Sequence, residues 1–559
     1  MRQKQIDIDK SVMIKIEYRW VDHISSYLRK FKYLAEIITL LLYAGALIFV
    51  LYYHEPWFDE AQAWLIARDA TMMELLGSIT HYEGHPPIWF LLLMPFAKLG
   101  VPFELGVKAV NFILVTMAMG LVIFKAPFHR LIRCTIPFTY FFFYQHGVIS
   151  RTYSLMMFGF IVSALFYKER NEKPFRFIAA LSVICGASAY GILLAAGITI
   201  AWLWEVLEKP LSWSKIKLFL KSKVFYAMLI LLLYNILLML SIYPFPDTFA
   251  ISTYEKQPIA VVLFYMFFVA PASALCTMDP YDATMDIKIF LMFIFISIII
   301  NLLLYLLAKK AKMHLFFMVP YLLFAVFAST VYFSTHHIGI LTMFYLFLLW
   351  CFFQKSNMFN QKWLHYGACT LIPIVIGISI YWSVIASVND VLLNYGTGRE
   401  AAKFITENKL DEKNILVAWR QTLDEETGEK YDDYNSLQGI PTLAYFDTNI
   451  FYNFNHQLNH KCYLLHKINK DSSTIHGLIK NSYPEVLLKT DHPGFIFGSE
   501  INMEDFALVK SVHGNNIWKD ITIEDRQFIY IRKDLLKNYP NLHELNMEEE
   551  KVILPNPTK

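Results

Sequence analysis

Long apolar runs recur between about residue 34 and residue 386, and they constrain the fold of this chain more than any other feature. About 20 consecutive apolar residues cross the hydrocarbon core of a bilayer as a helix, and several of these runs reach that length. The chain of 559 residues is 56% hydrophobic and 17% charged, which is more apolar than a soluble core requires. We therefore predict a polytopic α-helical membrane protein.

Basic residues between the runs predict the orientation of the chain, because Lys and Arg accumulate in cytoplasmic loops. The segment before the first run carries Arg2, Lys4, Lys10, Lys15, Arg19, Arg29, Lys30 and Lys32. We expect residues 1–33 to be a cytoplasmic tail rather than a cleavable signal, since no small-residue cleavage site follows the first run. The segment that begins at His54 is then expected on the outer side of the cytoplasmic membrane.

Run length and basic flanks together predict about eleven spans in a transmembrane domain at residues 34–389. After the first span, the predicted spans are Phe103–Phe124, Leu131–Val148, a run ending at Lys168, two short spans within Phe177–Leu207 that turn at Ser188–Gly191, Val224–Ile242, Ile287–Leu307, Met313–Phe333, Ile338–Phe353 and Leu364–Ala386. Two further runs, Pro87–Leu99 and Ile259–Thr277, are expected to lie along the membrane surface. They belong to the predicted outer loops 54–102 and 243–286.

From about Asp390 the composition becomes that of a soluble domain, and an odd number of spans places this domain outside the cytoplasm. We predict an α/β domain at residues 390–533 and a polar tail at 534–559. A capping box at Thr397–Glu400 predicts a helix through Asn408. Strands are predicted at Ile415–Trp419, Thr442–Phe446, Val486–Leu488 and Phe528–Ile531. The aromatic residues of this domain either form its core or bind glycans: Trp419, Tyr445, Tyr452 and Trp518.

Several classes of function are disfavoured by composition. The net charge of +3 and the absence of a separate basic domain argue against a nucleic-acid partner. The six cysteines show neither zinc-site spacing nor a disulfide framework. No glycine-rich phosphate loop occurs in the sequence, which argues against a nucleotide-driven pump. We predict neither a metal nor a cofactor.

Unusual polar residues near the apolar runs all fall at the outer membrane surface on this topology. Ionisable groups at such depth are costly and often mark substrate paths. The candidate site residues are Asp59, Glu60, Glu83, His85, Arg151, Tyr153, Tyr190, His336 and His337. Asp59 and Glu60 follow Pro56 in a helix-favouring stretch, and adjacent residues on a helix point about 100° apart. We expect one carboxylate to act as a general base while the other orients it or caps the helix.

Each of these residues also has a plain structural interpretation. Asp59 and Glu60 are both favourable at the positive N-terminus of a helix. Pro86 restrains His85 to an extended conformation beside Glu83, or else His85 is a solvent-facing residue at a helix start. The Arg151 guanidinium suits phosphate oxygens, and it also suits snorkelling at the end of a span. His336 and His337 are open to the same structural interpretation. A metal site at His81, Glu83 and His85 is disfavoured, because Gly84 and Pro86 interrupt the helical spacing.

Taken together, three segments resemble the GT-C glycosyltransferases of the family 39 type, which include protein mannosyltransferases and the aminoarabinose transferases acting on lipid A. The segments are Phe58-Asp59-Glu60 after the first span, His85-Pro86-Pro87 before a short apolar helix, and Ser150-Arg151-Thr152-Tyr153-Ser154 at the next outer loop. The resemblance extends over about Tyr33 to Ala386. The predicted outer segment Tyr243 to Asp286 is similar to the large outer loop of that fold.

The resemblance implies transfer of a sugar from a polyprenyl-phosphate donor to a lipid, glycan or protein acceptor at the outer leaflet, with inversion at the anomeric carbon. In that case Asp59 is the base, Glu60 supports it, and Arg151 is the cation near the donor phosphate. His337 stands where related enzymes often carry a cation for the carrier phosphate. The chain would then work among membrane lipids and without a metal.

Two other classes of protein stay open on the sequence alone. A secondary transporter or flippase would use the outer charges as a gate, although such proteins often carry paired internal repeats and none is evident here. A sensor or scaffold would present the C-terminal domain to a partner.

Overall fold

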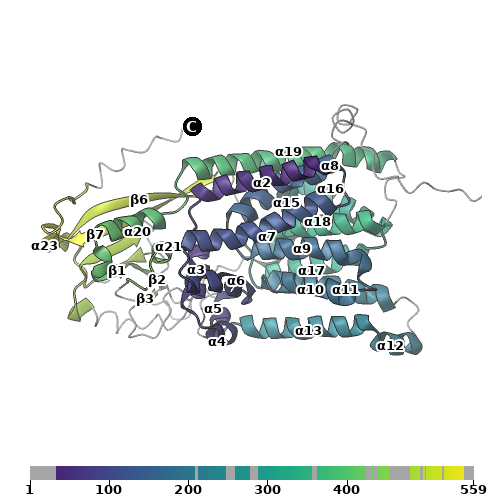
Figure 1. Cartoon of the computed structure of the whole chain (residues 1–559), viewed down its shortest axis with the longest axis horizontal. Helices are drawn as coiled ribbons and strands as arrows, with labels where there is room; N and C mark the ends of the chain where they lie inside the picture. Colours follow the sequence, from purple (N-terminus) through teal and green to yellow (C-terminus); the bar gives the residue numbers. More distant parts are fainter. Residues whose placement is uncertain are drawn as a thin grey trace, which may run out of the picture.

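The structure is a computed structural model, and it combines a bundle of long helices with a small sheet-containing domain at one end (Figure 1). The description covers residues 33–207, 212–246, 248, 258–276, 287–355, 362–423, 430–433, 439–451, 477, 479–490, 495–497, 499–518 and 521–546. The predicted N-terminal tail, except Tyr33, lies outside these residues.

The helical part runs from α2 to α19. Its helices are α2 (Leu34–Tyr53), α3 (Phe58–Asp69), α4 (Met72–Glu74), α5 (Thr80–Glu83), α6 (Ile88–Lys98), α7 (Phe103–Lys125), α8 (Arg130–Thr135), α9 (Tyr153–Phe166), α10 (Pro174–Cys185), α11 (Ala189–Leu207), α12 (Trp213–Leu220), α13 (Lys223–Ile242), α14 (Ile259–Phe268), α15 (Ala270–Cys276), α16 (Ile287–Lys310), α17 (His314–Thr330), α18 (Ile338–Lys355) and α19 (Lys362–Leu392). The predominance of long apolar helices confirms the predicted polytopic helical class.

Among the described residues, seven helices are long and apolar enough to cross a membrane, or eight if the bent pair α14 and α15 forms one span. The seven are α2, α7, α11, α13, α16, α18 and residues 371–392 of α19. The finer count of eleven stays a prediction, because α9, α10 and α17 have only 14, 12 and 17 residues. Helices of that length cross a core of about 30 Å only where the bilayer thins or other residues extend them.

The predicted span Leu131–Val148 is not one continuous helix. It consists of α8, a 3₁₀ turn at Ile136–Phe138 and a π-helix at Phe141–Val148. Pro137 lies in the first turn of the 3₁₀ segment, where its missing N–H and fixed φ interrupt the preceding helix. The wide π turn that follows is a form often found at functional sites.

The run predicted to hold two short spans does contain two helices, α10 and α11, but the predicted turn at Ser188–Gly191 is misplaced: the break lies at residues 186–188, and Ala189 begins the 19-residue α11. Their close connection depends on Gly191, since a Cβ atom there would lie 2.0 Å from the carbonyl oxygen of Ile184. The two runs predicted to lie along the membrane surface also form short helices. These are α6, and the α14 and α15 pair, which is bent by 43°.

The C-terminal domain contains two small sheets. The larger has the order β1 (Ile415–Val417), β4 (Val486–Thr490), β7 (Ile521–Arg532), β6 (Phe506–Trp518); β1 and β4 are parallel and the other pairs antiparallel. The smaller has the order β3 (Lys430–Asp433), β2 (Trp419–Leu423), β5 (Phe495–Ile496). Helices α20 (Gly398–Glu407), α21 (Ile440–Leu443) and α23 (Lys533–Leu536) complete the described elements. The domain therefore has a small mixed sheet.

The strands and the helix predicted for this domain are confirmed in part. Strands occur at three of the four predicted places, but the predicted strand Thr442–Phe446 is wrong. Pro441 lies in the first turn of α21 instead, a position that proline favours. The helix predicted from Thr397 is present as α20, but Thr397 makes no side-chain cap, and Glu400 pairs with Lys510 on β6.

The predicted polar tail begins with α23, and four apolar residues of this segment pack against the domain: Leu535, Leu536, Tyr539 and Leu542. Of the four aromatic residues singled out above, Trp419 is fully buried and Tyr445 packs against the core, as the core interpretation predicts. Tyr452 and the side chain of Trp518 lie outside the described part.

The C-terminal domain and the helices between α2 and α7 share one hydrophobic core. That core includes Trp64 and Leu65 of α3, Ile405 of α20 and Leu443 of α21. The ring of Phe103, at the start of α7, lies 5.2 Å from the ring of Tyr445 in an edge-to-face contact. The domain thus packs directly on α3, the helix that carries Asp59 and Glu60 (Figure 1).

Candidate active site

All nine candidate residues lie on segments at the end of the bundle nearest the C-terminal domain. Asp59 and Glu60 occupy the first turn of α3, Glu83 ends α5, and His85 follows it. Arg151 precedes α9, and Tyr153 begins it. Tyr190 lies in the first turn of α11, and His336 and His337 form a 3₁₀ turn before α18.

Asp59 forms an ion pair with Arg151, with 2.6 Å between a carboxylate oxygen and a guanidinium nitrogen. The two side chains are 23% and 15% exposed, so the pair is accessible from one side. The guanidinium carbon lies 5.8 Å from the Trp57 ring and 5.4 Å from the Tyr153 ring, within the range of cation–π attraction. Burial raises the pKa of Asp59, and Arg151 opposes that rise. Arg151 therefore faces a carboxylate and aromatic rings rather than snorkelling to water.

Glu60 differs completely from its neighbour, since it is 0% exposed and both of its oxygens are occupied. One oxygen accepts the N–H of Ser150 at 2.6 Å. The other accepts the N–H of Trp57 at 3.1 Å and lies 3.2 Å from Nε2 of His54. Because Ser150 directly precedes Arg151, Glu60 fixes the backbone on both sides of the Asp59–Arg151 pair. The geometry favours a positioning role for Glu60 over a direct catalytic one.

His54 connects Glu60 to the end of the last helix of the bundle. Its Nδ1 lies 2.9 Å from Asp390 and its Nε2 lies 3.2 Å from Glu60, and all three side chains are 0% exposed or nearly so. A neutral imidazole carries one N–H, whereas the protonated ring can donate to both carboxylates. Burial alone would lower the pKa of His54, but Asp390 and Glu60 raise it to about 9. His54 is therefore a buried cation between two acids.

Four histidine rings surround Tyr153. The distances from its ring centroid are 6.4 Å to His85, 5.6 Å to His146, 6.3 Å to His336 and 5.9 Å to His337. Tyr190 joins this cluster through a ring distance of 4.6 Å to His337. Residues separated by more than 250 positions in the sequence thus meet beside Arg151. We call Tyr153, Tyr190 and the four histidines the Tyr153 cluster.

Several buried polar atoms around Arg151 have no hydrogen-bond partner within the described part of the chain. They are Trp57 Nε1, His85 Nδ1, His146 Nε2 and the Tyr153 hydroxyl. A buried polar group without a partner costs about 1–3 kcal/mol, so native proteins seldom collect several in one place. Their concentration here indicates a site at which the polar atoms of a ligand complete the hydrogen bonding.

The histidines of the cluster outside the helical spans are neutral. Burial lowers the pKa of His85 to about 3, and Arg151 contributes to the lowering. Burial likewise lowers the pKa of His336 and of His337 well below the ordinary value. These rings can orient a ligand by hydrogen bonding and packing, while Arg151 supplies the positive charge.

Glu83 is a second buried acid that interacts with Asp59. Gln62 on α3 donates a hydrogen bond of 3.0 Å to Oε1 of Glu83. Burial raises the pKa of Glu83 well above the ordinary value, and the charge of Asp59 adds to this effect. Burial thus disfavours the charged form of both acids, and Asp59 is the one whose charge an ion pair with Arg151 supports.

His146 belongs to the site, although sequence reasoning missed it because it lay inside a predicted span. The π-helix Phe141–Val148 carries it, and its side chain is 1% exposed. A Cβ atom at Gly339 would lie 2.2 Å from Nε2 of His146, so the ring fits only because residue 339 is glycine. An ionisable residue within an apolar run was the signal that could have identified it.

His54 and Asp390 were also missed. His54 was treated only as part of the segment that contains the acid pair, and Asp390 only as the start of the C-terminal domain. Both are ionisable residues at the ends of apolar runs, which is the same signal that selected the other candidates.

A second polar network holds the segment after α2 against the C-terminal domain. Arg399 of α20 donates to both oxygens of Glu104 at 2.7 Å and to the backbone oxygen of His54 at 3.0 Å. The backbone N–H of Arg399 donates to a carboxylate oxygen of Glu55 at 2.6 Å. Lys108 donates to the same His54 oxygen at 2.6 Å and also pairs with Glu104. We call Glu55, Glu104, Lys108 and Arg399 the junction network.

Burial raises the pKa of Glu55 to about 7, although Arg399 acts in the opposite direction. The hydroxyl of Tyr445 adds a further donor to Glu104 at 2.7 Å. Every charged member of the junction network thus has a partner, and the C-terminal domain helps to hold the loop that leads into α3.

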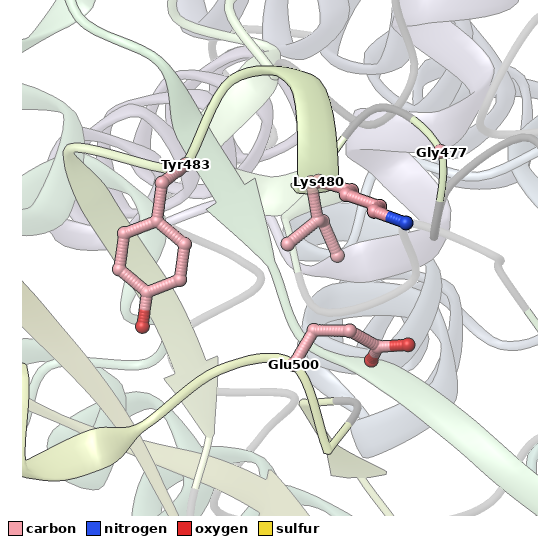
Figure 2. Close-up of a pocket in the computed structure, with 5 residues that line it drawn as sticks. Gly477, Lys480, Tyr483 and Glu500 are labelled. Atoms are coloured by element: carbon pink, nitrogen blue, oxygen red, sulfur yellow. The ribbon is translucent and has the colours of Figure 1, made fainter.

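Within the described residues, no group of three or more His, Cys, Asp or Glu side chains is arranged to hold a metal ion. The C-terminal domain carries a separate depression of about 400 Å³, lined by Gly477, Ile479, Lys480, Tyr483 and Glu500 (Figure 2). None of these residues belongs to the candidate active site.

No family model, no curated protein and no solved structure matches this chain.

Proposed function

We propose that this protein is a membrane glycosyltransferase that moves a sugar from a polyprenyl-phosphate donor to an acceptor hydroxyl, with inversion at the anomeric carbon. The observation that carries the proposal is the accessible Asp59–Arg151 pair among buried, unpartnered polar atoms. A carboxylate and a cation side by side are the two groups that such a transfer requires. The resemblance to GT-C enzymes of the family 39 type supports the same assignment.

In the proposed reaction, Asp59 accepts the proton of the acceptor hydroxyl as the acceptor oxygen forms its bond to the anomeric carbon. The bond between that carbon and the phosphate oxygen breaks, and its electron pair stays on the phosphate. Negative charge therefore develops on the leaving lipid phosphate. A guanidinium such as Arg151 stabilises that charge through charge-assisted hydrogen bonds.

Other groups orient these two residues. Glu60 accepts the N–H of Ser150 and the N–H of Trp57, so it supports both the base and the cation through their backbones. The neutral rings of the Tyr153 cluster would contact the sugar or the carrier. Tyr153 and His146 each have a buried polar atom ready to bind a substrate oxygen.

A membrane-embedded site suits a donor with a long isoprenoid tail, since the tail partitions into the bilayer. The distribution of Lys and Arg supports an orientation with the site and the C-terminal domain outside the cytoplasm. Cysteine introduced at the exposed position Lys403, with native Cys462 replaced, would test this orientation. We expect an impermeant thiol reagent to label it in intact cells; protection would contradict the orientation.

The decisive experiment compares purified wild type with Asp59→Asn for transfer from a panel of polyprenyl-phosphate sugars. We expect transfer by the wild type and a large loss in the variant. Asp69→Asn is a matched control, because Asp69 lies on the same helix but pairs with Arg68. A wild type that transfers none of the sugars, or an Asp59→Asn variant that stays fully active, would contradict the proposal.

A further inference from the structure

We propose that the carrier phosphate and Asp59 compete for Arg151, so that the donor binds by displacing the Asp59 carboxylate and thereby frees the base. This inference rests on the proposed function. Without a donor, one carboxylate oxygen of Asp59 lies 2.6 Å from a terminal guanidinium nitrogen of Arg151. A phosphate oxygen that binds the same nitrogen must replace it.

The charges around Arg151 favour the exchange. Among the described residues, Asp59 is the ion-pair partner of Arg151, and the neighbouring Tyr153 cluster of two tyrosines and four histidines contains no Lys or Arg. Lys108 and Arg399 are occupied by Glu104 in the junction network. Arg151 is therefore the cation available to an incoming phosphate beside the Tyr153 cluster, and a carboxylate left next to Arg151 would repel the phosphate at close range.

The geometry allows the exchange without movement of the backbone. Glu60 holds the chain on both sides of the pair through Trp57 and Ser150, so only the side chain of Asp59 has to turn. The pair is 23% and 15% exposed, which leaves an open side for the phosphate to approach. The Tyr153 hydroxyl has no hydrogen-bond partner among the described residues, and the Tyr153 ring lies 5.4 Å from the guanidinium carbon, so the hydroxyl can donate to a phosphate oxygen bound at Arg151.

The exchange would couple donor binding to the strength of the base. Arg151 restrains the rise that burial causes in the pKa of Asp59. Once Arg151 turns to phosphate, Asp59 loses this restraint and becomes a stronger proton acceptor. The base would then reach full strength only when a donor is present.

Binding of undecaprenyl phosphate, the carrier without a sugar, to the purified full-length protein tests the inference without turnover. We expect Asp59→Asn to bind this probe about fivefold more tightly than the wild type, which corresponds to the loss of a competing, partly exposed ion pair worth about 1 kcal/mol. Arg151→Gln should lose most of the binding. Asp69→Asn should bind as the wild type does, and undecaprenol, which lacks the phosphate, should bind equally to all four proteins.

The outcomes separate the inference from the proposed function. Equal or weaker binding of undecaprenyl phosphate by Asp59→Asn, with wild-type transfer intact, would overturn the inference alone. Tighter binding combined with full transfer by Asp59→Asn would support the exchange and overturn the role of Asp59 as base. A wild type that neither binds the carrier nor transfers a sugar would overturn both. If Asp59→Asn fails to fold, Asp59→Ala provides the same comparison.

Discussion

Two neighbouring acids on α3, Asp59 and Glu60, have nearly opposite environments. Asp59 is 23% exposed and has an ion-pair partner that a ligand can reach. Glu60 is 0% exposed and is bound by two backbone N–H groups and the His54 ring. Adjacent positions on a helix differ by about 100°, so a single turn can present one acid to a substrate and direct the next into the protein. Adjacent acids in a sequence therefore need not share a role.

The same contrast extends to two larger regions. In the junction network, every charged member has a partner, which makes the network rigid. Around Tyr153, by contrast, several buried polar atoms have no hydrogen-bond partner in the part of the chain that the structure describes. The difference indicates that the junction network satisfies its own hydrogen bonding, whereas the region around Tyr153 is where a ligand would complete it.

The largest expected effect on activity is that of Asp59→Asn. Loss of a general base lowers the rate by about 10²–10⁴-fold. The melting temperature should change little, because Asp59 is partly exposed and Asn retains its shape. Transfer assays and thermal unfolding of the same preparation would measure both quantities. If Asp59→Asn is inactive because it has unfolded, Asp59 has a structural role, and its contrast with Glu60 disappears.

His54→Ala should instead act mainly on stability. It leaves Asp390 and Glu60 as buried acids without a cation, and breaking a buried pair by removing one partner costs about 3–5 kcal/mol. His54→Gln should recover part of this loss, since an amide can still donate to a carboxylate. Thermal unfolding of the two variants in the same detergent would test the order. Equal stability of wild type and His54→Ala would show that the bridge has no structural role.

Gly339→Ala should disturb the Tyr153 cluster without changing a charged residue. The added Cβ would lie 2.2 Å from His146 Nε2, and overpacking of this kind costs about 1–3 kcal/mol. We expect the transfer rate to fall by more than the loss of folded protein accounts for. Gly377→Ala is the matched control, because nothing lies within 4 Å of a Cβ there. Equal activities of the two variants would argue against a role for the His146 position.

The pH dependence of stability should reveal the charge of His54. Its pKa rises from about 6.5 in an unfolded chain to about 9 in the folded protein. The stabilisation is therefore fully present below about pH 6.5 and is lost as the pH rises through about 9. The difference in melting temperature between wild type and His54→Gln should shrink from pH 6 to pH 10. The charge of His54 lowers the pKa of Glu55, so both proteins should carry Glu55→Gln to remove that titration from the difference. A gap that widens with pH would contradict the assignment.

The helical class and the candidate residues followed from run length and from the rarity of ionisable groups in apolar surroundings. The break in Leu131–Val148 did not, because a single proline within an apolar run does not reveal whether the helix kinks or changes form. The π-helix that follows this break carries His146. The strand expected at Thr442–Phe446 failed because the β preference of five residues was outweighed by Pro441, which favours the start of a helix.

The different environments of Asp59 and Glu60 also could not be predicted from the sequence. It depends on Ser150, His54 and Asp390, which are up to 336 positions away from one another in the chain. Such long-range partners are fixed by tertiary packing rather than by local pattern. The sequence could say that two acids lie at one helix start, but only the fold assigns them different partners.

Helix α19 makes Asp390 sensitive to rotation as well as to distance. The helix has 31 residues and extends about 46 Å at a rise of 1.5 Å per residue. Since Asp390 lies within this continuous helix, one inserted residue would swing it about 100° away from His54, whereas seven inserted residues would nearly restore its direction. A chimera that is joined within α19 before Asp390 must therefore keep the rotation of the helix at the junction. A flexible linker at that point would not hold Asp390 toward His54.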